Sequence, residues 1–231
     1  MLEEIAENIW CAEQPLKYFG LGIRTRMTVI RLSNGDLAVI SPIRIDSSAA
    51  HHQLNALGRV GHIVAPNLYH YMFAADFKSL YPDTLFWATP GLRERQPHLP
   101  IDRIIEERTF FNELECIFLE GFRTLVPSGF ESLNEYVFLH SATRTLIITD
   151  AAFNFDKTFS LPIQLAARAS GIYNKLGPSV LEKVAIREKE TMKRSIEKVL
   201  NWDFDRVIMA HGSVIEEGGK KALTEAYQFL R

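Results

Sequence analysis

Alternating apolar and polar positions in the first part of the chain predict two β-strands joined by a tight turn. Residues 27–32 (MTVIRL) and 37–41 (LAVIS) are rich in the β-branched and aliphatic residues that are typical of strands. The polar run 33–36 (SNGD) separates them, and an Asn-Gly pair between two apolar runs is a strong hairpin signal. We therefore expect a β-hairpin over residues 27–41.

After this hairpin, the pattern alternates between strands and helices. Asp and Ser side chains accept hydrogen bonds from free N–H groups, so the run that begins at Asp46 favours a helix start. We expect, in order, a helix from Asp46 to Gly58, a strand over 61–65, a helix over 69–80 and a strand over 84–88. Such alternation implies parallel strands joined by helical crossovers.

The second half of the chain repeats the mixture of strands and helices. We expect strands over 115–119, 134–140, 144–149 and 206–210, and helices over 160–170, 178–200 and 216–230. We find no repeat and no low-complexity linker, so residues 1–231 are expected to form a single α/β domain. Two halves of this kind fit a four-layer αββα sandwich, although the pattern alone fits other α/β folds equally well.

Composition and charge narrow the classes of partner. Hydrophobic residues make up 47% of the chain, charged residues 23%, and the formal net charge is −2, as in ordinary globular proteins. No basic patch or arm favours nucleic acid, and no apolar run approaches the roughly 20 residues that span a bilayer. The acidic start, residues 1–10 (MLEEIAENIW), is not a signal peptide. We expect a cytoplasmic protein that binds neither nucleic acid nor membrane; oligomeric state is not indicated.

The two cysteines, Cys11 and Cys116, lie far apart in apolar, strand-like runs. Because they form no Cys-x-x-Cys pair, we expect neither a disulfide framework nor a zinc knuckle. Each is expected to be a small buried apolar residue.

Three residues with metal-binding side chains share one placement in the sequence. His70, Asp150 and His211 each follow the C-terminal end of a predicted strand, where ligands gather in α/β sheets. If these strands are neighbours, the three side chains converge. Two histidines and one carboxylate form a three-point metal site with open positions for water or substrate. The other histidines lack this placement: His51, His52, His62, His98 and His140.

A purely structural interpretation of these residues is also available. Asp150 would cap the turn that follows it, and each histidine would bond a main-chain carbonyl. On spacing alone the structural interpretation is favoured, because short motifs of this kind often arise by coincidence.

The order of the motifs resembles the metallo-β-lactamase-fold superfamily. Its enzymes carry a His-x-His-x-Asp-His motif after a strand, then a Gly-His loop, an Asp after a strand and a C-terminal His-Gly. Here residues 65–70 (APNLYH) keep only the last His of the first motif, and 127–130 (PSGF) lies where the Gly-His loop falls. Residues 146–150 (LIITD) and 207–212 (VIMAHG) match the last two motifs.

The chain also resembles one uncharacterised branch of that superfamily, a domain of unknown function found in bacteria and plants. This resemblance covers about residues 5 to 225 and implies the αββα sandwich fold. It rests on short segments in a fixed order, namely Met27-Thr-Val29, Ser41-Pro42, His70, Tyr81-Pro-Asp83, Pro90-Gly-Leu92, residues 144–150 and Phe153-Asn154.

The resemblance implies a metal site that is degenerate on one side only. The positions that match the three histidines of one metal are Ala65, Asn67 and the loop around Gly129, none of which supplies an imidazole. The other metal keeps three of its four ligand types, with Tyr69 in place of an Asp. A phenol with a pKa of about 10 is a poor ligand, so Tyr69 is not expected to bind a metal.

These considerations define the expected site. The metal ligands are His70, Asp150 and His211, holding one divalent ion (zinc, iron or manganese). Asn67 and Tyr69 are expected to contact a small-molecule substrate, or else to fill the lost half of the site by hydrogen-bonding to its remaining residues.

Two functions, and the presence or absence of a metal, stay open at this point. One is a hydrolase-like enzyme with a single metal at the expected site. The other is a non-catalytic binding or scaffold protein that holds no metal.

Overall fold

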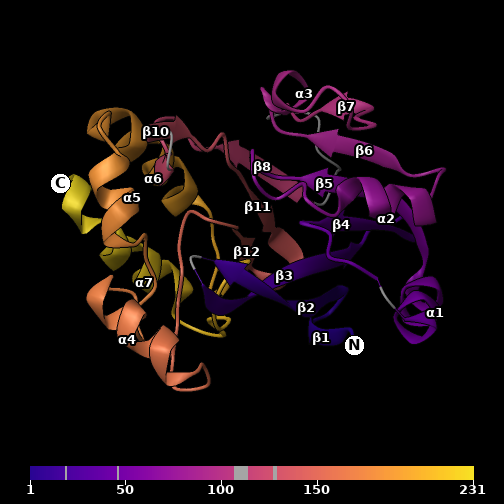
Figure 1. Cartoon of the computed structure of the whole chain (residues 1–231), viewed down its shortest axis with the longest axis horizontal. Helices are drawn as coiled ribbons and strands as arrows, with labels where there is room; N and C mark the ends of the chain where they lie inside the picture. Colours follow the sequence, from indigo (N-terminus) through magenta and orange to yellow (C-terminus); the bar gives the residue numbers. More distant parts are fainter. Residues whose placement is uncertain (19, 46, 107–113, 127–128) are drawn as a thin grey trace.

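The chain folds into two β-sheets that face each other, with helices on the outer side of each (Figure 1). The computed structural model describes residues 1–18, 20–45, 47–106, 114–126 and 129–231. The helices against the N-terminal sheet are α1 (Ser48–Leu57), α2 (Ala74–Leu80) and α3 (Leu92–Arg95). Helices α6 (Lys189–Asn201) and α7 (Gly219–Ala226) lie against the C-terminal sheet. Helix α5 (Val180–Ala185) contacts residues 123–126, and α4 (Leu161–Ala169) packs on residues 21–31 of the N-terminal sheet. This arrangement confirms the expected αββα sandwich.

The N-terminal sheet has seven strands in sequence order. They are β1 (Glu3–Ala6), β2 (Ile9–Tyr18), β3 (Leu21–Arg31), β4 (Asp36–Ile40), β5 (Arg59–Ala65), β6 (Leu85–Ala88) and β7 (Arg103–Ile104). The first four pair antiparallel, and β4 to β7 pair parallel through helical crossovers. The predicted hairpin is the β3–β4 pair, and its turn is closed by a bond of 2.9 Å from the Asp36 N–H to the Asn34 side chain.

The C-terminal sheet has four strands in the order β13-β12-β11-β8. They are β8 (Leu114–Phe118), β11 (Tyr136–His140), β12 (Thr145–Ile147) and β13 (Arg206–Ile208). Only β12 and β13 pair parallel among them, so their carboxyl ends lie side by side. A separate ribbon is formed by β9 (Arg123–Val126) and β10 (Gly129–Ser132). Pro127 and Ser128, in the segment compared with the Gly-His loop, lie outside the described residues.

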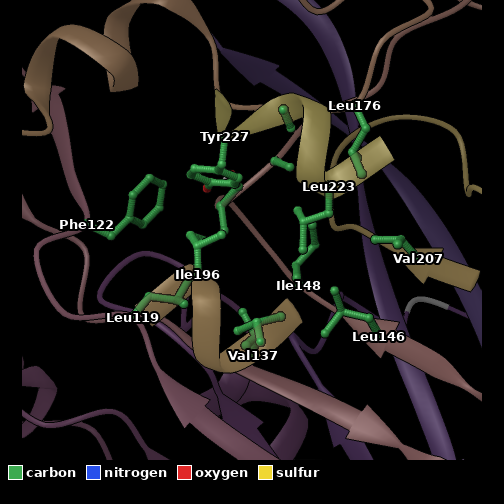
Figure 2. Packing of buried hydrophobic residues seen from close by; sticks show 14 of the residues in the cluster. Leu119, Phe122, Val137, Leu146, Ile148, Leu176, Ile196, Val207, Leu223 and Tyr227 are labelled. Atoms are coloured by element: carbon green, nitrogen blue, oxygen red, sulfur yellow. The ribbon is translucent and has the colours of Figure 1, made fainter. Parts of the chain in front are cut away.

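Alternate residues of each strand point into different layers of the core. On β3, Val29 packs toward the N-terminal helices whereas Ile30 packs between the sheets. On β12, Leu146 packs toward the C-terminal helices whereas Ile147 packs between the sheets. Figure 2 shows the C-terminal helical layer, where side chains of β11, β12, β13, α6 and α7 meet, among them Val137, Leu146, Val207, Ile196 and Leu223. This period of two is what buries both faces of both sheets.

Two expected helices are wrong in their limits, each for a local physical reason. The helix expected over 69–80 begins only at Ala74, because the Asn67 side chain binds the N–H groups of Tyr69 and His70 and holds them in a turn. The helix expected over 178–200 is broken into α5 and α6. Ile186, which is 2% exposed, adopts an extended backbone there and enters the core.

Other boundaries differ less. The last helix, expected over 216–230, is α7 followed by a short 3-10 turn at Gln228–Leu230. Helix α1 begins at Ser48 with Ser47 as its cap, and Asp46 lies outside the described residues. Strands β1 and β7 are short pieces that the apolar pattern does not predict.

Cys11 and Cys116 are both free and both buried in the layer between the sheets, as expected. Burial raises the pKa of the Cys11 thiol to about 11. Within the described ranges, no helix combines the length and the apolar character that crossing a membrane requires.

Candidate metal centre

Three side chains with metal-binding chemistry meet where strands of both sheets end. His70 follows β5, Asp150 follows β12 and His211 follows β13. His70 Nε2 lies 3.3 Å from Asp150 Oδ2, and His211 Nε2 lies 3.5 Å from Asp150 Oδ1. The three residues each offer one ligand atom, and these atoms all lie within 4.8 Å of one another. The structure therefore brings together the three residues that the sequence singled out, with the carboxylate in contact with both imidazoles.

His211 is held by a tight turn and by a strand of the opposite sheet. Its Nδ1 donates to the main-chain carbonyl of Arg24 at 2.8 Å, which leaves Nε2 facing Asp150. The next residue, Gly212, has φ of +115°, and a Cβ there would lie 2.3 Å from the carbonyl oxygen of Asn154. Only glycine fits this close approach, so the His-Gly pair is a requirement of the turn.

Arg26 on β3 also holds this turn, through hydrogen bonds to its main-chain carbonyls. Its side chain is almost fully buried and donates to the carbonyl of Met209 at 2.5 Å and to that of Gly212 at 2.7 Å. Its main-chain N–H donates to the Ala210 carbonyl at 2.9 Å, and its charge is balanced by Glu13. Arg26 thereby satisfies carbonyls on both sides of His211.

His70 is oriented by contacts on both its backbone and its ring. Its N–H donates to Asn67 Oδ1 at 2.9 Å, which fixes the turn after β5. Its Nδ1 lies 2.5 Å from the hydroxyl of Ser41, which directly follows β4 and has φ of +55°. A left-handed backbone is unusual for serine, and such conformations cluster at functional sites. The ring is thus fixed with Nε2 toward Asp150.

Asp150 is placed by two buried polar residues. Asn67, which is 0% exposed, donates from Nδ2 to Asp150 Oδ2 at 2.8 Å and to the hydroxyl of Thr149 at 2.9 Å. Glu135, also 0% exposed, accepts the main-chain N–H of Asp150 at 2.9 Å. The hydroxyl of Tyr227 donates to the carbonyl of Ala151 at 2.6 Å, so the C-terminal segment also holds this loop.

The surroundings of the site keep the Asp150 carboxylate ionised and shift the pKa values of the two histidines in opposite directions. Burial lowers the pKa of His211 below its ordinary value. Burial acts the same way on His70, but the Asp150 carboxylate outweighs it and raises the pKa of His70. For Asp150, burial alone would raise the pKa, yet His70, then His211 and Asn67, bring it down to about 2. Burial and the Asp150 charge raise the pKa of Glu135 to about 7. Asp150 is therefore an anion at neutral pH.

Tyr69 lies apart from the three converging residues, contrary to the interpretation in which its hydroxyl bonds them. Its hydroxyl donates to Glu131 Oε2 at 2.9 Å, and the same oxygen accepts Arg95 at 2.8 Å. The Arg95 guanidinium also lies 4.7 Å from the centre of the Tyr69 ring. Burial is the main cause that raises the pKa of Tyr69, which keeps the phenol neutral. Asn67, by contrast, hydrogen-bonds Asp150 as expected. Whether either residue contacts a substrate stays a prediction.

Sequence reasoning missed three residues that build this site: Ser41 as the partner of His70, Arg26 and Glu135. A signal existed for the last two. Each is a charged residue next to an apolar strand run, and such residues are almost never buried unless paired.

Comparisons with known proteins agree with this architecture. The family described as "Domain of unknown function (DUF4336)" matches residues 6–173. No curated protein matches the chain.

Solved metallo-β-lactamases share the fold over the whole of this chain. DIM-1 metallo-β-lactamase exposed to ceftazidime is 13% identical, with 97% of its chain covered and a TM-score of 0.67. The FIM-1 enzyme of Pseudomonas aeruginosa, in its mono-zinc form, is 8% identical, with 94% covered and a TM-score of 0.67. A metallo-β-lactamase of Pontibacter korlensis is 10% identical, with 98% covered and a TM-score of 0.63. The expected metallo-β-lactamase fold is confirmed.

Proposed function

Since the chain belongs to the DUF4336 family, whose description names no function, we propose a function from its own residues: it binds one divalent metal ion and acts as a hydrolase-like enzyme. The proposed ligands are His70 Nε2, one oxygen of Asp150 and His211 Nε2. Zinc, iron and manganese all accept two histidines and a carboxylate.

The spacing of the donor atoms is the observation that carries the proposal. His70 Nε2 lies 3.3 and 3.4 Å from the two oxygens of Asp150, and His211 Nε2 lies 3.5 Å from Oδ1. These distances exceed the roughly 2.7–2.9 Å of a charge-assisted hydrogen bond. They match the edge of a tetrahedron around a metal with bonds of about 2.0–2.1 Å, which is roughly 3.4 Å. The distance from Asp150 to each histidine therefore fits a shared cation better than a direct hydrogen bond, and all three ligand atoms lie within 4.8 Å of one another.

The outer partners of the ligands support the same assignment. Metal-binding histidines generally direct their second ring nitrogen to a carboxylate, a main-chain carbonyl or a water molecule. His211 does so through the Arg24 carbonyl, and in His70 the Ser41 hydroxyl takes this place. Both arrangements fix the ring that presents Nε2 to the centre.

When bound, a divalent ion in this site would lower the pKa of a water and polarise a substrate oxygen. The chain's own residues determine access and charge. Asp150 is the most open of the three, with a side chain 17% exposed against 8% for His70 and 9% for His211. The Asp150 anion supplies the negative charge that a cation needs, and Asn67 holds that carboxylate in one orientation. A small-molecule substrate would approach from the solvent side of Asp150.

The fold relatives support the hydrolase part of the proposal by analogy only. The solved structures named above are metallo-β-lactamases, and one of them is described in a mono-zinc form. A fold hosts many chemistries, so the substrate must be found by assay.

A non-catalytic binding or scaffold protein is the second candidate, and one observation favours it. Asp150 has hydrogen-bonding partners within the chain, since Asn67 donates to Oδ2 and His70 lies beside the carboxylate. A buried carboxylate with such partners is stable without a metal.

Elemental analysis of the purified protein after loading with zinc, iron or manganese tests the first candidate. We expect one metal per chain and loss of that metal in His211→Ala. His98→Ala removes an exposed histidine outside the site and serves as the control, which should bind as the wild type does.

Activity on ester, thioester and phosphodiester substrates is then measured with and without metal. Metal-dependent turnover that His211→Ala abolishes supports the enzyme. If the protein takes up none of the three metals, the metal proposal is wrong and the non-catalytic candidate is left.

A further inference from the structure

Glu135 is a buried carboxylate that no ligand role explains. It directly precedes β11, its side chain is 0% exposed, and it is not among the converging ligand atoms. An isolated buried carboxylate is costly, so its partners indicate why the fold keeps it.

The partners of Glu135 are consecutive main-chain N–H groups around the central ligand. Oε1 accepts from Thr149 at 2.8 Å and from Ala151 at 3.2 Å, and Oε2 accepts from Asp150 at 2.9 Å. One side chain therefore holds the whole segment that follows β12. These bonds fix the main chain of this segment, and with it the point from which the Asp150 side chain extends.

Asn67 links Glu135 to the Asp150 carboxylate itself. Its Nδ2 lies 3.3 Å from Glu135 Oε2 and 2.8 Å from Asp150 Oδ2. The same oxygen lies 3.3 Å from His70 Nε2, and Oδ1 lies 3.4 Å from His70 Nε2 and 3.5 Å from His211 Nε2. Glu135 thus holds the main chain of Asp150 while Asn67 holds its Oδ2, and together they present the carboxylate to both imidazoles.

We propose that Glu135 is a positioning residue that sets Asp150 for a single cation, by holding its backbone and, through Asn67, its second oxygen. This inference rests on the proposed metal binding. It goes beyond that proposal because it names the group that fixes the main chain around the central ligand. Glu135 itself touches neither the metal nor the substrate.

Cobalt binding to the folded protein tests the proposal, with Glu135→Gln as the variant. Glutamine keeps the size of the side chain but places an NH2 group against main-chain N–H donors, so the segment must shift. We expect one cobalt per wild-type chain. In the variant we expect a dissociation constant roughly 10–100-fold higher and a changed visible spectrum of the bound cobalt.

Glu182→Gln is the matched control. Glu182 is also buried, and its carboxylate accepts the Ser179 N–H at 2.9 Å at the start of α5. We expect the control to lose stability without any change in cobalt affinity or spectrum. Equal affinity and spectrum in wild type and Glu135→Gln would overturn the positioning role while leaving the proposed metal site intact. Two cobalt ions per wild-type chain in the site would also overturn it.

Two further measurements keep the test decisive. If Glu135→Gln does not fold, Glu135→Asp retains both acceptor oxygens on a shorter side chain; wild-type affinity there overturns the proposal, and weakened affinity supports it.

If the wild type binds no cobalt, the proposed function fails. In that case, amide hydrogen exchange measures, independently of any metal, whether Glu135 protects the main-chain N–H groups that it binds. Faster exchange at Thr149, Asp150 and Ala151 in Glu135→Gln supports the contact, and unchanged exchange refutes it.

Discussion

The hydroxyl of Ser41 lies 2.5 Å from Nδ1 of His70, and Ser41 directly follows β4, whereas the proposed ligands follow β5, β12 and β13. The end of β4 thereby contributes to the site through the orientation of an imidazole. Because the ring can turn about its own bonds, this contact decides which nitrogen faces Asp150.

Replacing Ser41 with alanine is expected to weaken zinc affinity roughly 10–100-fold, as loss of an outer hydrogen-bond partner of a metal-bound histidine does. Titration with a zinc indicator measures the effect. Ser79→Ala is the control, because Ser79 is exposed on α2 and its hydroxyl donates to the Ala75 carbonyl of the same helix, away from the site. Equal zinc affinities in all three proteins would show that Ser41 does not orient His70.

Replacing Arg26 with methionine is expected to lower the free energy of unfolding by about 2–4 kcal/mol, because two buried carbonyls, those of Met209 and Gly212, lose a charged donor. Urea denaturation measures the change. On the same strand, Arg31 is exposed and bonds Asn8, so Arg31→Met should cost less than about 1 kcal/mol. A similar loss in both variants would count against Arg26 as the support of the His211 turn.

Replacing Gly212 with alanine is expected to destabilise the protein by about 3 kcal/mol and to abolish zinc binding, since the new Cβ would overlap the Asn154 carbonyl. Gly35→Ala is the comparison. Gly35 has φ of +84° with nothing near its Cβ, so only the backbone cost of about 1–2 kcal/mol applies. Thermal unfolding and zinc titration report both effects, and a Gly212→Ala protein that still binds zinc normally would contradict the described turn.

The Cys11 thiol is expected to make stability fall at alkaline pH. Its pKa is raised from 9.0 to about 11 by burial, so the stability it contributes is complete below pH 9 and is lost as pH rises toward 11. A shift of that size corresponds to about 3 kcal/mol. Denaturation of wild type and Cys11→Ala across this range measures the difference, which should shrink with pH. Parallel curves would mean that Cys11 ionises as readily in the folded protein as in the unfolded one.

The sequence predicts the placement of His70, Asp150 and His211 because each follows an apolar strand, and strand ends are local features. Which strands lie side by side is not local, and the resemblance to a known family supplied that step. The hairpin of β3 and β4 needs no such help, because its Asn-Gly turn is encoded in adjacent residues.

The remaining features depend on contacts between distant segments. Glu135 and Arg26 hydrogen-bond to main-chain groups, and a motif of side chains in the sequence does not predict where distant main-chain groups lie. Tyr69 turns toward Glu131, a residue 62 positions away, so its spacing from His70 gave no indication of its partner. The break between α5 and α6 arises because Ile186 packs into a core that the helical period alone does not describe.

The bond from His211 to the Arg24 carbonyl joins residues that are 187 positions apart. Contacts of such separation form late in folding, because the chain must first close a long loop. During synthesis the N-terminal sheet emerges first, complete with His70 but without β13. His211 therefore reaches its partners only after the second half has been made and folded, so a metal bound at the proposed site would report a completely folded chain.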